Sequence, residues 1–266
     1  MNENRNQFQY NMKARKITVV NHKGGVGKTM TTANLGAALA VLGQKVLLVD
    51  SDSQCNLTSQ CIEDVKVPTL HEYLNDDDIR MQPQEVSENL FIIPGSSQLD
   101  EDNNNIVLSV EEDADAATHY IDSILKRVED DYDYILIDSA PGSGAMLVNV
   151  IVAADELLVP IADRFSISGA KKLTQIIRAN KKSIKGHYLL TRQTNYGLYR
   201  QIKDLLTAQS PESLYHTSIR QCEDLNKASA YRMSIFDYKP KSKGAEDYMA
   251  LAKEISGVSK ETDMPF

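Results

Sequence analysis

The stretch that decides the fold lies near the N-terminus and reads Ile17-Thr18-Val19-Val20-Asn21-His22-Lys23-Gly24-Gly25-Val26-Gly27-Lys28-Thr29. Its first four residues form an apolar run that predicts a short buried strand. The glycines that follow predict a turn, and a helix is expected from about Lys28 to Leu42. Glycines let a backbone approach an anion closely, and the N–H groups of such a turn can cradle phosphates together with the positive helix end. The stretch therefore predicts a phosphate-binding loop.

This loop departs from the usual spacing G-x-x-x-x-G-K-[ST], which would place a glycine where this chain has His22. Lys28 supplies positive charge for the β- and γ-phosphates of a nucleotide, and the Thr29 hydroxyl can bind Mg²⁺. A second lysine, Lys23, stands at the entrance of the loop. The expected nucleotide-binding residues are Lys23, Gly24, Gly25, Val26, Gly27, Lys28, Thr29 and Met30.

The composition is that of an ordinary globular protein: 266 residues, 42% hydrophobic and 25% charged. No apolar run approaches the roughly 18 residues of a membrane helix, and the N-terminus lacks the apolar core of a signal peptide. The cysteines, Cys55, Cys61 and Cys222, are few and lack the paired spacing of a zinc site. Such cysteine usage suits a reducing compartment, so we expect a cytoplasmic protein.

Charge is unevenly distributed along the chain. The net charge is −8, yet residues 164–243 hold 16 Lys and Arg against 5 Asp and Glu. Such segregation suggests that one face meets a polyanion, although a solvated lysine-rich surface would have the same composition. The candidate DNA contacts are Arg192, Arg200, Lys203, Arg220, Lys241 and Lys243.

Further apolar runs alternate with helical patterns along the chain. The run Val46–Val49 lacks polar alternation, which predicts a strand that is buried on both faces and hence a parallel sheet. Strands that alternate with helices predict a mainly parallel, twisted sheet with helices on both faces, built from right-handed βαβ units. The expected strands after the first are Val46–Val49, Leu90–Ile93, Tyr134–Ile137, Leu157–Pro160, Tyr188–Leu190 and Ser213–Ile219.

A single domain is expected from residue 17 to residue 256. A flexible arm at residues 1–16 precedes it, and a tail at residues 257–266 follows it. Within the domain we expect a polar loop at Asp100–Asn105, one amphipathic helix at Ala114–Asp130 and a basic helix at Ser168–Lys182.

Carboxylates follow two of the expected strands. Asp50 and Asp52 end the second strand, and Asp138 follows Tyr134–Ile137. The carboxyl ends of parallel strands meet at one edge of a sheet, so these acids should lie beside the phosphate loop. Asp138 fits the aspartate that holds Mg²⁺ with Thr29. Of Asp50 and Asp52, one could support the metal while the other orients and deprotonates an attacking water. The alternative for Asp52 is a turn or helix cap.

These motifs resemble those of the MinD/ParA family of deviant phosphate-loop ATPases, and most closely its ParA/Soj partition branch. The resemblance covers nearly the whole chain after residue 16. Lys23–Thr29 is similar to the family's defining loop, Val46–Asn56 to its second motif and Tyr134–Gly142 to its magnesium motif. Asp237–Glu246 resembles the version found in partition proteins.

The resemblance implies an ATP- and Mg²⁺-dependent ATPase that partitions a plasmid or chromosome. Asp52 would position the attacking water, and Lys23 would cross to the ATP of the other subunit in a face-to-face homodimer. The ATP-bound dimer would bind double-stranded DNA on the nucleoid without sequence specificity. A ParB-like, centromere-binding adaptor would stimulate hydrolysis and so release the DNA.

The chain also departs from the family pattern. Ser53 stands where the family has proline, Arg164 where it often has glutamate, and Ile219–Asp224 replaces a segment that usually carries two arginines. Three alternatives stay open: a positioning ATPase for a non-DNA cargo, MinD-like placement of the division site, and a nucleotide-binding module without catalysis. Placement at a membrane needs a C-terminal amphipathic helix, which residues 257–266, with two acids and a proline, cannot form. We therefore expect no membrane partner.

Overall fold

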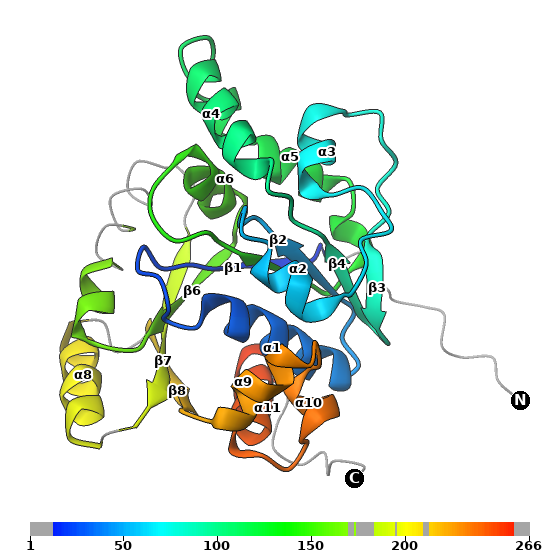
Figure 1. Ribbon diagram of the computed structural model, residues 1–266. Helices are drawn as coiled ribbons and strands as arrows, with labels where there is room; N and C mark the ends of the chain where they lie inside the picture. Colours follow the sequence, from blue (N-terminus) through cyan, green and yellow to red (C-terminus); the bar gives the residue numbers. More distant parts are fainter. Residues whose placement is uncertain (1–12, 170–172, 174–183, 195, 210–212, 258–266) are drawn as a thin grey trace, which may run out of the picture.

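The computed structural model describes residues 13–169, 173, 184–194, 196–209 and 213–257. In this part of the chain, strands form an eight-stranded sheet in the order β3-β4-β2-β5-β1-β6-β7-β8, with helices on both faces (Figure 1). Neighbouring strands are parallel except for the edge strand β3, which runs antiparallel to β4. The expected parallel α/β fold is confirmed.

The elements have the following bounds. The strands are β1 (Arg15–Val19), β2 (Val46–Asp50), β3 (Gln84–Ser87), β4 (Leu90–Ile93), β5 (Tyr134–Asp138), β6 (Glu156–Ile161), β7 (Lys185–Gln193) and β8 (Leu214–Arg220). The helices are α1 (Lys28–Val41), α2 (Asn56–Cys61), α3 (Leu70–Asn75), α4 (Leu99–Ser109), α5 (Tyr120–Lys126), α6 (Ala145–Ala153), α8 (Tyr196–Gln209), α9 (Glu223–Ala230), α10 (Ile235–Tyr238) and α11 (Lys243–Ser256), and short 3₁₀ turns occupy η1 (Ala116–Thr118) and η2 (Glu129–Asp131).

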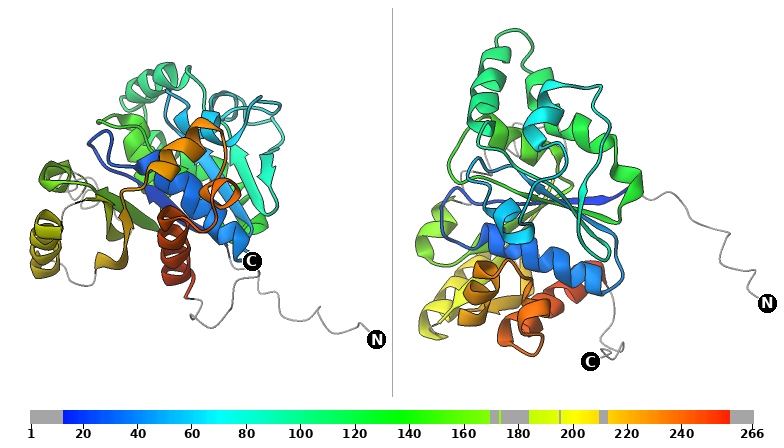
Figure 2. Two further views of the ribbon diagram at one scale, coloured as in Figure 1. Left: turned by 60° about the horizontal axis from the view of Figure 1, so that its bottom comes forward. Right: turned by 45° about the vertical axis from the view of Figure 1, so that its right-hand side comes forward.

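The sheet separates two apolar layers. Buried residues of α3, α4, α5, α6 and α8 pack on one face, and those of α1, α2, α9, α10 and α11 pack on the other. Figure 2 shows the same division from two further directions. Because both faces are covered, every residue of β2, β5 and β6 is buried. The central strand β1 lies between β5 and β6, so the loop that follows it sits at the middle of the carboxyl edge.

Helix α1 lies unusually close to the sheet. A Cβ atom on Gly36 would stand 2.6 Å from Leu48 Cδ2 and 3.3 Å from Leu90 Cδ1. The lack of a side chain at Gly36 therefore permits the middle of α1 to lie close against β2 and β4.

The expected polar loop at Asp100–Asn105 is wrong, because these residues lie within α4. Acids in the first turn interact favourably with the positive end of a helix. Asp102 is buried and accepts hydrogen bonds from the His71 ring and the Asn75 amide, each 2.8 Å long. The polar residues of α4 thus have partners in α3, which is distant in sequence.

The single helix expected at Ala114–Asp130 is also wrong. The chain leaves the helical conformation at His119 and again at Val128, where φ is −115° and −135°. The segment therefore divides into η1, α5 and η2. Strand β3 and the helices α2, α9 and α10 were not expected, and the basic helix expected at Ser168–Lys182 lies almost entirely outside the described residues, although residues 164–169 are helical.

Strand β1 begins at Arg15, so the end of the expected N-terminal arm belongs to the sheet. The Lys16 side chain is buried, with its Nζ 2.8 Å from Glu129 Oε2 and 3.2 Å from Asp122 Oδ1. Lys13 Nζ also lies 2.6 Å from Glu129 Oε1. Burial acts to raise the pKa of Glu129, but its hydrogen bonds to the two lysines outweigh burial and lower that pKa. We call Lys13, Lys16, Asp122 and Glu129 the ion cluster.

Candidate active site

The predicted site residues meet at the carboxyl edge of the sheet. Strand β5 pairs with β1 and β2 so that Asp138 stands level with Val19 on one side and with Asp50 on the other. The loop after β1 and the acids that end β2 and β5 therefore lie side by side. This is where parallel α/β sheets bind ligands.

Two glycines give the phosphate loop its shape. Gly25 and Gly27 have φ angles of +73° and +92°, a region that L side chains rarely adopt. Gly27 is the N-cap of α1 and provides no side-chain hydrogen bond to the helix. The N–H groups of the first turn of α1 are therefore available for an anion.

Lys28 is buried inside this loop. Its side chain folds back across the loop, where Nζ lies 3.5 Å from the Lys23 carbonyl oxygen. Burial lowers the pKa of Lys28, and the nearby carboxylates of Asp138 and Asp52 partly oppose this effect. Among the residues that the structure describes, the Lys28 ammonium forms no ion pair, as expected of a group that binds phosphates.

Thr29 and Asp138 form the pair expected of a magnesium site. The Thr29 hydroxyl donates a hydrogen bond of 2.6 Å to Asp138 Oδ2. Burial, and then the charge of Asp50, raises the pKa of Asp138 to about 8. A divalent cation bound here would favour the ionised form of this carboxyl group. The hydroxyl and carboxylate oxygens are ligands that Mg²⁺ prefers.

The two acids at the end of β2 have different surroundings. Asp50 Oδ2 accepts hydrogen bonds from the Thr58 N–H and hydroxyl, at 2.8 and 2.7 Å, and its Oδ1 accepts the Asp52 N–H. Burial raises the pKa of Asp50 to about 6. Asp50 thus connects the end of β2 to α2, whereas Asp52 lines the cavity beside the phosphate loop.

A cavity of about 500 Å³ opens in front of the loop. One wall is made by the predicted residues Gly24, Gly25, Gly27, Lys28, Thr29 and Met30 together with Asp52, whereas Val26 is buried behind it. The opposite wall was not predicted. It is made by residues of α2, the turn after β5, the ends of β7 and β8, α9 and α11, and their position beyond the strand ends was the available signal. The volume lies in the usual range for small-molecule sites. The unpredicted residues are Asn56, Gln60, Pro141, Thr191, Ile219, Gln221, Cys222, Leu225, Asn226, Ser229 and Tyr248.

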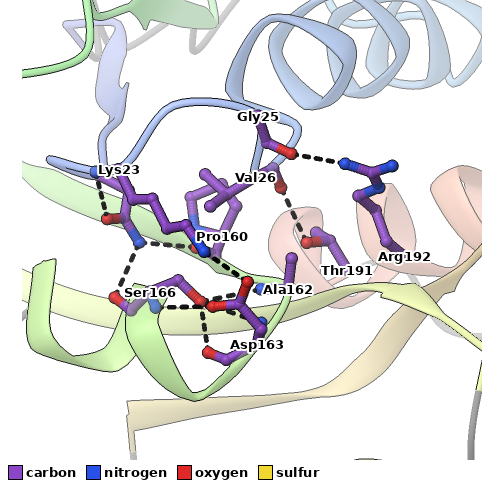
Figure 3. Close-up of polar contacts among 10 residues, drawn as sticks. Lys23, Gly25, Val26, Pro160, Ala162, Asp163, Ser166, Thr191 and Arg192 are labelled. Carbon is purple, nitrogen blue, oxygen red and sulfur yellow. Dashed lines mark hydrogen bonds and ion pairs between the residues drawn. The ribbon is translucent and has the colours of Figure 1, made fainter.

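The end of β7 holds the phosphate loop in place (Figure 3). The Thr191 hydroxyl donates to the Val26 carbonyl oxygen at 2.8 Å, and Arg192 Nη1 donates to that of Gly25 at 2.9 Å. In both hydrogen bonds the acceptor is a carbonyl oxygen of the loop, so the N–H groups of the loop stay available for a ligand. Arg192, a predicted DNA contact, is therefore engaged with the phosphate loop.

Lys23 lies at the rim of the cavity, and its side chain points to Asp163 of the same chain (Figure 3). Its Nζ lies 2.5 Å from Asp163 Oδ2 and 5.4 Å from the centre of the Phe165 ring. Its backbone N–H donates to Asn21 Oδ1 at 3.0 Å. Among the described residues, Lys23 is not part of the cavity wall.

The remaining candidate DNA contacts fall into two groups. Arg220 is neutralised, since its Nη2 lies 2.7 Å from Asp247 Oδ1 and 2.8 Å from Glu246 Oε2. These bonds raise the pKa of Arg220 above its ordinary value. The side chains that stay exposed are those of Arg200 and Lys203 on α8 and of Lys241 and Lys243 near the start of α11.

Known proteins are similar to this chain in sequence. A family model described as an AAA domain matches residues 14–189. The sporulation initiation inhibitor protein Soj of Bacillus subtilis is 32% identical over 259 residues, which cover 90% of this chain and 97% of that protein. The chromosome-partitioning ATPase Soj of Treponema pallidum is 32% identical over 253 residues, which cover 90% of this chain and 96% of that protein. The chain belongs to the ParA/Soj family of ATPases.

Solved structures have the fold of this ParA/Soj protein. The Cyanothece McdA(D38A)–ATP complex superposes with a TM-score of 0.80 at 20% identity and covers 94% of this chain and 99% of its own. A putative plasmid partition protein from Borrelia burgdorferi bound to AMPPNP gives 0.77 at 21% identity, with 92% and 99% covered. Within the described part of this ParA/Soj protein, no helix is both long and apolar enough to span a bilayer.

Proposed function

We propose that this ParA/Soj protein binds and hydrolyses Mg²⁺-bound ATP and uses the cycle to partition DNA. The observation that carries the proposal is the Thr29–Asp138 hydrogen bond of 2.6 Å beside the buried ammonium of Lys28. Lys28 and the loop N–H groups bind the phosphates, while Thr29 and Asp138 hold Mg²⁺. The metal neutralises charge that develops on the transferred phosphoryl group.

Asp52 serves as the residue that orients the attacking water. Its carboxylate lines the cavity, and its Oδ1 is held by the Gln54 N–H at 3.0 Å. A positioned carboxylate can direct a water in line with the departing phosphate and accept its proton. The opposite cavity wall, which includes Thr191 and Cys222, receives the base and ribose.

Two copies of the chain enclose ATP between them in a face-to-face homodimer. The Lys23 side chain is 37% exposed at the rim of the cavity, so a second subunit can reach it. A cation supplied across such a seam stabilises transition-state charge, and arginine residues that act in this way are worth roughly 10³–10⁵ in rate. ATP binding and dimer formation are thereby linked.

The dimer binds double-stranded DNA on the nucleoid without sequence preference. Support comes from the exposed cations Arg200, Lys203, Lys241 and Lys243, whereas Arg192 and Arg220 already have partners in the protein. A ParB-like adaptor bound at the centromere then accelerates hydrolysis and releases the DNA.

The test combines turnover and DNA binding. Phosphate release is measured for the protein alone, with plasmid DNA, and with DNA and the adaptor encoded beside it. DNA binding is followed by fluorescence anisotropy with ATP or ADP over a range of salt. Six phosphate contacts per dimer predict a slope of about −5 in a plot of log affinity against log salt. Absence of ATP-dependent DNA binding at low salt would contradict the proposal.

A paired substitution tests which surface binds DNA. If all four α8 side chains of a dimer contact phosphates, changing Arg200 and Lys203 to Ala reduces the slope to about −2. Lys66→Ala is the matched control, because this exposed lysine lies beside β3, at the opposite end of the sheet. An equal effect of both changes would show that α8 is not the DNA surface.

A further inference from the structure

Lys23 forms a short ion pair within its own chain. Its ammonium lies 2.5 Å from Asp163 Oδ2, and the two side chains are each 37% exposed. Phe165 is 77% exposed, and the centre of its ring lies 5.4 Å from the ammonium. Asp163 and Phe165 both belong to the short segment that follows β6, and Figure 3 shows Asp163 beside Lys23.

The structure holds Asp163 in position for this pair. Its Oδ1 accepts the Ser166 N–H at 2.9 Å and so caps the helical residues 164–169. The Ser166 hydroxyl donates a hydrogen bond to the Asp163 carbonyl oxygen and accepts one from the Asp163 N–H. Because Oδ1 accepts the capping hydrogen bond, Oδ2 is the oxygen that pairs with the Lys23 ammonium. Burial acts to raise the pKa of Asp163, but its bonds to Lys23 and Ser166 prevail and lower that pKa.

The backbone that carries Lys23 is held against the same segment. Asn21 is completely buried and donates hydrogen bonds to the carbonyl oxygens of Pro160 at 2.8 Å and Ser166 at 3.1 Å. A Cβ atom on Gly169 would stand only 2.4 Å from Asn21 Oδ1, the oxygen that receives the Lys23 N–H. The loop entrance is therefore held against the segment after β6 by these hydrogen bonds and by close packing, and the Lys23 side chain lies where the two parts meet.

We propose that Asp163 is a positioning residue that holds the Lys23 ammonium on its own subunit until the phosphates of the partner subunit's ATP take it. The proposal rests on the proposed function, in which Lys23 acts across the dimer. Bound to Asp163, the ammonium stands outside the cavity wall, so dimer formation must break the ion pair in both subunits. Asp163 thus opposes the dimer and makes its formation depend on the stronger negative charge of ATP.

The expected size of this opposition follows from exposure. Ion pairs open to solvent shift an equilibrium by roughly 1.4- to 5-fold. A symmetrical dimer breaks two such pairs, so loss of the Asp163 charge should strengthen ATP-dependent dimerisation by roughly 2- to 30-fold. Such a bias is small enough for ATP to overcome, yet large enough to reduce the number of dimers formed without it.

The decisive variant is Asp163→Asn, because asparagine keeps the cap to Ser166 and removes the charge opposite Lys23. Dimer dissociation constants are measured by analytical ultracentrifugation with AMPPNP and magnesium, and nucleotide affinity by calorimetry. We expect the dimer constant to fall by roughly 2- to 30-fold with an unchanged melting temperature. Asp133→Asn is the matched control, since Asp133 accepts the Lys45 N–H at 2.7 Å at the far ends of the strands.

Combination with Lys23→Ala separates release of the lysine from a general structural effect. When the lysine is absent, Asp163→Asn should no longer change the dimer constant, whereas an effect on folding would persist. A dimer constant that is unchanged or higher in Asp163→Asn alone would overturn the inference. If the wild-type chain forms no dimer with AMPPNP, it is the proposed function that fails.

Discussion

Glu129→Gln tests how the start of the central strand is anchored. In the ion cluster, Lys16 is 6% exposed and Glu129 is 3% exposed, and their charged atoms are 2.8 Å apart. Removing one partner of a buried ion pair costs about 3–5 kcal/mol. Asp122 stays 3.2 Å from Lys16, so we expect the lower end, about 3 kcal/mol. At about 2–4 °C per kcal/mol, the melting temperature at pH 7 should fall by about 6–12 °C.

The pH dependence gives a second check on this substitution. The pKa of Glu129 is lowered from its ordinary value of 4.5 in the folded chain. A lowered pKa stabilises the fold above the ordinary value, and this contribution disappears as the pH falls through the folded value. The difference between wild type and variant should therefore be full at pH 7 and shrink progressively below pH 4.5.

Thermal unfolding followed by circular dichroism measures both effects. Glu111→Gln serves as the control, because this exposed acid should change stability by no more than about 0.5 kcal/mol. If Glu129→Gln melts within about 1 °C of wild type at pH 7, the cluster does not anchor the strand. A difference that persists unchanged in acid would show that the charge of Glu129 is not its source.

Three further substitutions test the site and the core. Asp52→Ala should keep ATP binding by calorimetry and abolish phosphate release, and wild-type turnover would remove its water-positioning role. Lys28→Ala should weaken ATP binding by about 30-fold or more, since a desolvated charge pair is worth at least about 2 kcal/mol, and calorimetry showing wild-type affinity would contradict this. Gly36→Ala should destabilise the fold in urea, because an overlap at 2.6 Å from Leu48 costs about 1–3 kcal/mol and outweighs a helix-propensity gain of about 1 kcal/mol. A more stable variant would show that α1 can move away from the sheet.

Local sequence patterns predicted the central strands and the phosphate loop well. Strands β2 and β5 are apolar runs that end in aspartate, and both faces are buried, so the pattern and the environment agree. Gly25 and Gly27 were informative for a similar reason, because their positive φ angles are a property of the loop itself.

Errors arose where partners come from distant parts of the chain. Polar residues made Asp100–Asn105 look like a loop, yet Asp102 is paired with His71, and Asn103 Oδ1 accepts the Met146 N–H at 3.0 Å at the start of α6. Tertiary contacts of this kind override local preference. No local pattern could have revealed them.

Charge counting had the same weakness. Arg220 belongs to the basic segment, but its guanidinium is bound to Asp247 and Glu246 of α11. Arg192 lies against the phosphate loop instead of on an open cationic surface. A count of charges cannot distinguish a cation that is free to bind a polyanion from one that is already paired.

The two polar ends of β1 have a consequence for how such a chain tolerates mutation. The ion cluster lies at one end and the phosphate loop at the other, separated by a strand that rises roughly 3.3 Å per residue over Arg15–Val19. The length of this five-residue strand exceeds the roughly 7–10 Å beyond which substitutions usually act independently. The residues that stabilise the fold and those of the catalytic site therefore lie at different ends of one strand. A lineage can lose or regain stability at Lys16 and Glu129 while its chemistry at the other end stays intact.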